Sequence, residues 1–154
     1  MFKRVLKNER GLTLIELLAV IVILGIIAAI AIPAIGAIMD NSKKDAHIAN
    51  AKQVASAARL AIAADNNTKT SYTLKELYDG GYLENIPKSP GKHSTNKYDA
   101  EKSKVDIVKE TDSNNNVTGI LYKVKLVDGD GTFVYIDGTK EVDALTRKDV
   151  KLEE

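Results

Sequence analysis

Hydrophobic residues are concentrated in one stretch near the beginning of the chain. From Leu12 to Met39 the only charged residue is Glu16, and the twenty-three residues from Leu17 to Met39 carry no charge. As an α-helix, those residues would extend about 35 Å at roughly 1.5 Å per residue, enough to cross a hydrocarbon layer of about 30 Å. A secretory signal peptide has a shorter apolar region that ends at a cleavage site of small residues. The pattern therefore predicts a membrane-spanning helix.

Beyond Asp40 the hydrophobic pattern becomes periodic. Apolar side chains recur at intervals of three and four residues, which places them on one face of a helix. They are Ile48, Ala51, Ala55, Ala58 and Ile62. We expect one helix from about residue 12 to residue 64, with a membrane-spanning half over residues 12–39 and an amphipathic half over residues 40–65. The polar Asp65-Asn66-Asn67 should end it.

The remainder of the chain has shorter patterns. A short helix is expected over residues 71–80, ended by Gly80-Gly81, within a loop over residues 66–103. Strands are predicted at residues 104–109, 119–127 and 132–137, which are separated by turn-rich connections. In the second of them, Ile120, Tyr122, Val124 and Leu126 occupy alternate positions, with Lys123 and Lys125 between them, which predicts that these four share a buried face. These elements predict an α+β fold, in which the long helix packs against a small antiparallel sheet of three or four strands. Residues 104–154 would hold this sheet and a C-terminal tail, with either an edge strand near residues 150–152 or a mobile segment.

Charge is distributed unevenly, although the whole chain carries a net charge of only +1. The first eleven residues contain four basic residues and one acidic residue, so their net charge is +3 and that of the remainder is −2. Basic residues ahead of a membrane helix stay on the cytoplasmic side, so Asp40 and the residues after it should lie outside. The absence of cysteine excludes disulfide scaffolds, thiolate metal sites and cysteine catalysis.

The start of the apolar stretch contains a specific motif. Lys7-Asn8-Glu9-Arg10-Gly11 is followed by Leu12-Thr13-Leu14-Ile15-Glu16-Leu17-Leu18. This arrangement resembles the class III signal sequence of type IV prepilins and type II secretion pseudopilins, in which a basic leader ends in glycine and a glutamate follows shortly after. Pro33 lies where these proteins carry a helix proline. The departure is Leu12, where the family more often has phenylalanine or methionine.

The resemblance implies how the N-terminus is processed. A prepilin peptidase would remove residues 1–11 as a cytoplasmic leader by cutting between Gly11 and Leu12, and would methylate the new amine of Leu12. Glu16 would then face the Leu12 amine of a neighbouring copy in a helical filament.

The resemblance also implies partners and a location. A membrane platform protein and an assembly ATPase would build the filament from pilins of lollipop shape. The chain would cross the cell membrane once before assembly, with its N-terminus in the cytoplasm and lipid around its apolar half. After assembly it would lie in an extracellular pilus filament.

Glu16 has two interpretations. An acidic side chain in a membrane helix costs about 2.5–3.5 kcal/mol on insertion scales. Glu16 could lie near the interface and reach the lipid headgroups, or it could pair with a cation inside an assembly. Pairing with the Leu12 amine of a neighbouring subunit would remove the cost of two unpaired charges. The pair can form only when the two helices are shifted along the filament axis by one particular distance. The pair would then act mainly to set the register between subunits.

Glycine and proline interrupt the apolar helix at Gly25, Pro33 and Gly36. Pro33 lacks an N–H group, which leaves the carbonyl of Ala29 without its helical partner and favours a kink. One interpretation is that both residue types are simply frequent in membrane helices. The other, suggested by the resemblance to assembled pili, is local melting between Gly25 and Pro33 in the filament.

No enzyme site is legible in the sequence, and no cofactor is expected. His47 and His93 are the two histidines, and both are expected to be solvated. The phosphate-binding motif of ATPases is absent, so another protein must supply the energy for assembly. Asp128 and Asp130 are a weak Ca²⁺ candidate, but a simple turn is favoured there and no metal is expected.

Basic residues recur along the amphipathic half of the helix, at Lys43, Lys44, Lys52 and Arg59. A filament could present them as a stripe for nucleic acid. Asp40 and Asp45 are interleaved with them and no aromatic residue is near, so a solvated helix face is favoured. Nucleic acid stays a possible partner without support.

Three functions remain open. The first is the major pilin of a type IV pilus, used for adhesion, twitching motility or biofilm formation. The second is a pseudopilin of a type II secretion or competence DNA-uptake system. The third is a single-span anchored binding domain that never polymerises, and it predicts an N-terminus that is not processed.

Overall fold

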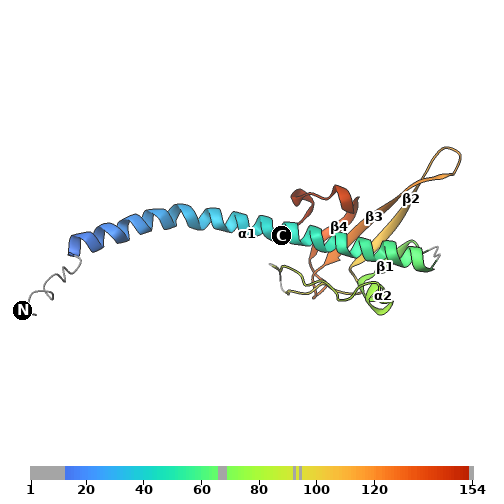
Figure 1. Ribbon diagram of the computed structural model, residues 1–154, viewed down its shortest axis with the longest axis horizontal. Coiled ribbons are helices and arrows are strands. Elements are labelled where there is room, and N and C mark those ends of the chain that lie inside the picture. The colour runs from blue at the N-terminus through green and yellow to red at the C-terminus, as the bar shows by residue number, and fades with distance from the viewer. Residues whose placement is uncertain (1–12, 66–68, 92, 94, 153–154) are drawn as a thin grey trace, which may run out of the picture. The chain divides into compact units, whose positions relative to one another are not determined.

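The computed structural model describes residues 13–65, 69–91, 93 and 95–152. Its longest element is helix α1, Leu14–Asp65, which contains Pro33 and is drawn from blue to green in Figure 1. The chain divides into two compact units between Met39 and Asp40, and each is considered by itself. The single long helix predicted from the hydrophobic pattern is confirmed, whereas Leu12 and residues 66–67 lie outside the described part.

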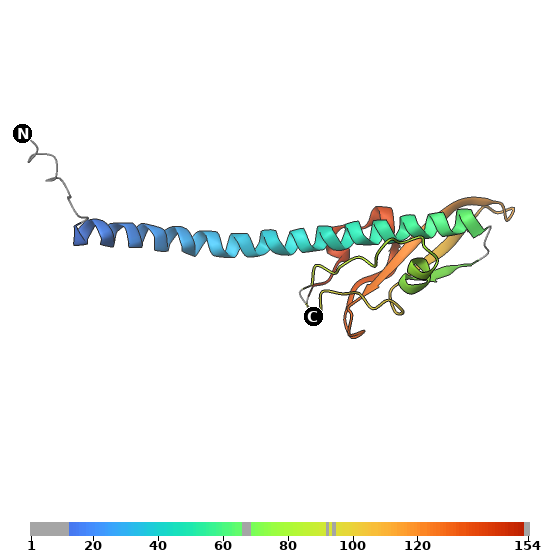
Figure 2. The same ribbon diagram turned by 60° about the horizontal axis from the view of Figure 1, so that its bottom comes forward.

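The second unit contains a four-stranded antiparallel sheet in the order β1-β2-β3-β4. The strands are β1 Ser71–Thr73, β2 Lys104–Thr111, β3 Val117–Val127 and β4 Val134–Glu141. Helix α2, Leu74–Asp79, and a long loop connect β1 to β2. The second half of α1 lies along one face of this sheet (Figures 1 and 2). The predicted α+β class, with a long helix on a small antiparallel sheet, is confirmed.

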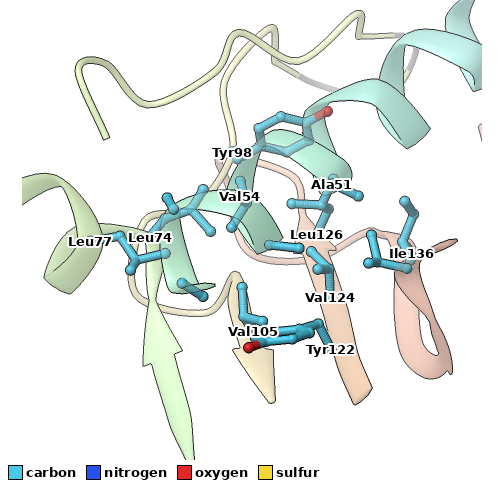
Figure 3. Packing of buried hydrophobic residues seen from close by; sticks show 14 of the residues in the cluster. Ala51, Val54, Leu74, Leu77, Tyr98, Val105, Tyr122, Val124, Leu126 and Ile136 are labelled. Atoms are coloured by element: carbon cyan, nitrogen blue, oxygen red, sulfur yellow. The ribbon is translucent and has the colours of Figure 1, made fainter. Parts of the chain in front are cut away.

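The second half of α1 packs on the sheet through small side chains. The fully buried apolar residues of this face are Ala51, Val54, Ala55, Ala58 and Ala61. Figure 3 shows Ala51 and Val54 pointing into the cluster that Val124 and Leu126 of β3 complete. Because alanine adds only one carbon beyond the backbone, the helix can approach the strands closely. The predicted helical stripe is therefore confirmed, with Ile48 and Ile62 partly buried against the same core.

Strands β2 and β3 form a hairpin that extends beyond the rest of the sheet (Figure 1). Its inner part alternates as predicted, with buried Tyr122, Val124 and Leu126. Ile120 was expected to share this buried face but is 41% exposed. The reason is its position, because β1 pairs only with residues 104–106 and β4 only with residues 123–127. The outer part of the hairpin therefore lacks a flanking strand within the described residues.

The single helix predicted for residues 71–80 was wrong in its first turn. Ser71, Tyr72 and Thr73 instead form the edge strand β1, which pairs with residues 104–106. Thr73 then caps α2: its hydroxyl accepts a hydrogen bond from the amide of Glu76, and the Glu76 carboxylate accepts one from the amide of Thr73. This capping box starts the helix only after Thr73. Gly80 ends it, as predicted.

The C-terminal tail is neither a strand nor detached. Two short 3₁₀ helices, Val142–Ala144 and Arg147–Asp149, precede Val150 and Leu152, which are both buried in the core. The amide of Lys151 donates one hydrogen bond, 2.9 Å long, to the carbonyl of Tyr135 in β4. The edge strand expected near residues 150–152 is therefore wrong, because a single bond does not form a ladder. The buried side chains of Val150 and Leu152 attach the tail to the core instead.

Candidate membrane and assembly site

The first half of α1 is not covered by any other described part of the chain. Its large apolar residues are exposed by between 47% at Val20 and 89% at Leu14. They are Leu14, Ile15, Leu17, Leu18, Val20, Ile21, Val22, Ile23, Leu24, Ile26, Ile27, Ile30, Ile32, Ile35, Ile38 and Met39. Soluble monomers rarely expose a contiguous apolar patch of more than a few hundred Å². This surface therefore requires lipid or other protein chains around it.

The same stretch has the length and composition of a membrane span. The helix beginning at Leu14 is long and apolar enough to cross a bilayer, and the described residues bury none of its most apolar part. The core helix of a soluble protein would be mostly covered by its own fold, which distinguishes it from this one. Within an α-helix the backbone groups of interior residues pair with one another, as a hydrocarbon environment requires; the exception here is the carbonyl of Ala29, which faces Pro33. These properties are consistent with anchoring in a membrane.

Glu16 closes a capping box at the start of α1. Its Oε2 accepts hydrogen bonds from the amide and from the hydroxyl of Thr13, both 2.8 Å long. The amide of Glu16 in turn donates to Oγ1 of Thr13, at 3.3 Å. The signal for this arrangement was present in the sequence, since Thr13-Leu14-Ile15-Glu16 has the spacing of a capping box, but it was overlooked there. Glu16 thus has a role in its own helix that neither sequence interpretation included.

The capping box occupies part of the Glu16 carboxylate but leaves room for an ion pair with another chain. Both of its bonds to Thr13 use Oε2, and Oε1 has no partner among the described residues. A carboxylate offers about four acceptor positions on its two oxygens. The same side chain can therefore cap its own helix and still accept a cation from outside.

Gly25 and Gly36 are not required by packing in the isolated chain. A Cβ added at either position would meet nothing within 4 Å. Helix α1 continues through both glycines and through Pro33. Glycine in a helix interior costs roughly 1 kcal/mol relative to alanine. Any steric reason for these glycines must therefore lie in contacts with other molecules.

Gly11 and Leu12, the predicted cleavage and methylation positions, lie outside the described residues. The first described residue after them is Thr13, which immediately precedes the helix. Cleavage before Leu12 would therefore leave the new terminus one residue from the capping box. The sequence prediction at this bond stays a prediction.

His47 is buried, contrary to the expectation that it is solvated. Its ring stacks on that of Tyr135, with centroids 4.1 Å apart, and its Nδ1 lies 2.6 Å from the hydroxyl oxygen of Tyr98. That hydroxyl also accepts a hydrogen bond from Asn50, and the Tyr135 hydroxyl donates to Oδ1 of Asp128. The signal was the spacing, because His47 stands four residues before Ala51 and so lies on the buried stripe.

Burial sets the protonation of this network. It lowers the pKa of His47 to about 4, against smaller opposing effects of the Gly91 backbone and of Asp128. Nε2 of His47 is buried and has no hydrogen bond within the described part of the chain. Burial also raises the pKa of Tyr98 and Tyr135. The histidine is therefore a neutral member of the core at neutral pH, with no accessible proton to exchange with a substrate.

The basic stripe is interrupted by ion pairs within the chain. Arg59 lies 2.9 Å from Asp143 and above the ring of Tyr122. Arg147 forms a two-pronged pair with Asp45, with distances of 2.6 and 2.7 Å. Arg59 and Asp45 are therefore engaged in holding the C-terminal tail to α1. This arrangement weakens the case for a continuous surface that binds nucleic acid.

His93, expected to be solvated in a loop, is in a loop, but its side chain is only 30% exposed and stacks on Phe133. The two calcium candidates lie beside it: one ligand atom each from His93, Asp128 and Asp130 fall within 4.8 Å of one another. Asp128 is fully buried and Asp130 is exposed. The sequence pattern identified the two acids, but it did not place the histidine with them.

Comparison with known proteins identifies the N-terminal segment. Residues 6–32 match the family described as the prokaryotic N-terminal methylation motif. This motif, with its class III signal peptide, is characteristic of type IV pilins and pseudopilins. No curated protein and no solved structure matches the chain. The match covers Gly11, Leu12, Glu16 and Gly25, and it ends before Pro33.

Proposed function

We propose that the chain is the major pilin of a type IV pilus, processed by prepilin peptidase and polymerised through its N-terminal helix. Its uses would be adhesion, twitching motility or biofilm formation. The observation that carries the proposal is the uncovered apolar half of α1, from Leu14 to Met39, on a chain with the methylation motif at residues 6–32. A structural subunit needs no catalytic site of its own.

Two environments can cover this half of the helix in turn. Lipid covers it while the chain waits in the membrane, with the N-terminus in the cytoplasm. The same half of neighbouring subunits covers it in the extracellular filament. Since hydrocarbon is as apolar as leucine, the exchange is not driven by hydrophobicity alone. A polar contact that exists only in the assembly can therefore favour one arrangement strongly.

Glu16 and the methylated amine of Leu12 are the proposed contact. Cleavage after Gly11 creates a positive charge at the edge of the apolar zone, close to an acidic side chain. Each charge is costly in that environment without a partner. Because Glu16 binds Thr13 through Oε2, the amine of a neighbouring subunit can approach the other oxygen. The platform protein and the assembly ATPase would supply the position and the energy for adding each subunit.

The decisive test separates the two roles of Glu16. Glu16→Gln keeps an oxygen that can cap the helix but removes the negative charge, whereas Glu16→Ala removes both. We expect both variants to be inserted and cleaved, and both to give few or no filaments in electron micrographs of cells that express the assembly machinery. Thr13→Val, which removes only the hydroxyl of the cap, is the matched control and should assemble. Normal filaments from Glu16→Gln would show that Glu16 acts through the cap alone.

Mass spectrometry of the purified chain tests the processing step. The expected mature protein begins at Leu12 and carries one methyl group on its amine. Retention of residues 1–11 in cells that contain prepilin peptidase would contradict the proposal and favour an anchored domain that does not polymerise. A processed chain without long surface filaments, whose deletion abolishes secretion or DNA uptake, would assign it instead to the pseudopilins.

A further inference from the structure

We propose that His93, Asp128 and Asp130 bind a divalent transition metal ion of the Zn²⁺ type, which fastens the loop before β2 to the turn between β3 and β4. This inference is independent of the proposed filament. It begins with the position of the three side chains. His93 belongs to the loop that follows α2, Asp128 follows the last residue of β3, and Asp130 lies in the next turn. One ligand atom from each falls within 4.8 Å of the other two.

The imidazole distinguishes this group from an ordinary acidic turn. The ring of His93 stacks on that of Phe133, with centroids 4.5 Å apart and an interplanar angle of 11°. This stacking orients Nδ1 toward Oδ2 of Asp128, at 3.9 Å. That distance is too long for a hydrogen bond. It is close to the separation of roughly 3.4 Å between two ligands of one tetrahedral ion, given bond lengths of about 2.0–2.1 Å.

Asp128 is held in place by hydrogen bonds to both of its carboxylate oxygens. Its side chain is fully buried. Oδ1 accepts hydrogen bonds from the hydroxyl of Tyr135 at 2.8 Å and from that of Thr95 at 3.1 Å. Oδ2 faces His93 and lies 3.5 Å from the amide of Asp130. Hydrogen bonds of this kind orient a ligating carboxylate and are a regular feature of metal sites.

Asp130 completes the set from the exposed side. Its Oδ1 accepts hydrogen bonds from the amide and the hydroxyl of Thr132, at 2.9 and 2.7 Å. The turn also presents the carbonyl oxygen of Gly131, which accepts a hydrogen bond from Nζ of Lys102 at 3.2 Å. The turn therefore already attracts one cation through oxygen atoms. The positive charge of the Lys102 ammonium lies near the proposed site and would repel a metal ion bound there.

The combination of ligands selects the class of metal. One imidazole nitrogen and two carboxylates suit Zn²⁺ and its neighbours in the first transition series, with water completing the coordination. Ca²⁺ prefers six to eight oxygen ligands and does not favour imidazole. A metal at this place would connect residues 93 and 128, which are far apart in sequence. It would stabilise the long loop in a chain that has no cysteine for a disulfide.

The test is metal binding by the full chain in detergent micelles, with any histidine tag removed and residual metal stripped by a chelator. Zn²⁺ is titrated in competition with a chromophoric chelator, and thermal unfolding is followed by circular dichroism with and without Zn²⁺. We expect one Zn²⁺ per chain and a higher unfolding midpoint when it is bound. His93→Ala should abolish both effects, and Asp130→Asn should weaken binding by about tenfold or more.

Asp112→Asn is the matched control, because the Asp112 carboxylate organises the turn between β2 and β3 by accepting hydrogen bonds from the amides of Asn114 and Asn116. It should bind Zn²⁺ as the unchanged chain does. His93 and Asp130 are exposed, so their variants should retain the circular dichroism of the folded protein. Absence of Zn²⁺ binding would overturn the proposal. So would Zn²⁺ binding that survives His93→Ala, or a preference for Ca²⁺ that does not depend on His93.

Discussion

The two halves of α1 share one backbone geometry and differ in what covers them. In the second half, Ala51, Ala55 and Ala58 are fully buried against the chain's own sheet. In the first half, every large apolar residue from Leu14 to Met39 is exposed by at least 47%. A helix that the chain covers contributes to the stability of the chain, whereas an uncovered apolar helix contributes only when another phase or another molecule surrounds it. The first half therefore needs lipid or other molecules to cover it.

The residue types agree with this difference. Close packing on the sheet selects alanine in the second half, since a larger side chain would push the helix away. The first half is rich in isoleucine, leucine and valine, which expose apolar surface in every direction around the helix axis. A helix that is hydrophobic all round is typical of a membrane span or of the centre of an assembly. The same substitution should thus have different consequences in the two halves.

The largest contrast is expected for one substitution made in each half. Ala58→Asp places an unpaired charge in the core, which costs several kcal/mol out of a total stability of about 5–15 kcal/mol. We expect this variant to lose its cooperative urea unfolding transition, measured by tyrosine fluorescence in detergent. Ala29→Asp should leave that transition unchanged, but should impair membrane insertion by about 2.5–3.5 kcal/mol. Equal loss of the transition in both variants would contradict the division between the two halves.

The second prediction concerns pH and involves only the covered half. The folded protein keeps His47 neutral down to a pKa of about 4, whereas in the unfolded chain histidine has its ordinary pKa of about 6.5. Protons therefore bind preferentially to the unfolded chain between these values. The free energy of unfolding should fall by on the order of 3 kcal/mol as the pH decreases from about 6.5 to about 4.

The control variants for this pH effect are the two histidines themselves. His47→Phe retains a ring for stacking on Tyr135 and removes the titrating group, so its urea midpoint should depend much less on pH in this window. His93→Gln should retain the dependence, because it leaves His47 and the rings that cover it unchanged. Identical pH profiles for His47→Phe and the unchanged chain would rule out His47 as the cause.

The third prediction compares glycines. Gly138 has φ +78°, and a Cβ there would lie 3.2 Å from Cβ of Lys125, at the irregular register between β3 and β4. Gly138→Ala should therefore lower the free energy of unfolding by about 1–2 kcal/mol. Gly25→Ala meets open space and should not destabilise the isolated chain. Urea titration measures both, and a filament assay of Gly25→Ala shows whether that glycine matters only between subunits.

The smallest effect is expected at the ion pair that connects the C-terminal tail to α1. The hydrogen bond with Arg147 lowers the pKa of Asp45, but both side chains are about half exposed. Exposed pairs contribute little and are screened by salt. Arg147→Ala should lower the thermal midpoint slightly at low ionic strength and not at high ionic strength. Lys148→Ala, its neighbour in the chain, is the control, and an equal effect of both variants would show that the pair is unimportant.

Much of the candidate site could be recognised from local sequence. Glu16 was singled out because a charge in a long apolar run is costly, and the methylation motif at residues 6–32 supports its context. The hydrogen bonds between Glu16 and Thr13 could also have been predicted from the capping-box spacing, although they were not. The association of His93 with Asp128 and Asp130 was not readable, since nothing in their separation along the chain indicates that a loop and a turn meet.

Local spacing along the chain was enough to predict the elements that repeat with a short period. Spacing along the chain predicts the apolar half of α1, its amphipathic half and the alternation of β3. It can do so because residues that are neighbours within a helix or strand are also close in sequence. The edge strand Ser71–Thr73, the rings that cover His47 and the position of the tail became visible only in the tertiary structure. Ser71–Thr73 acquires its hydrogen-bond partners from residues 104–106, and His47 is covered by rings from Tyr98 and Tyr135. Where the stabilising partner is distant in the chain, a local pattern carries no information about it.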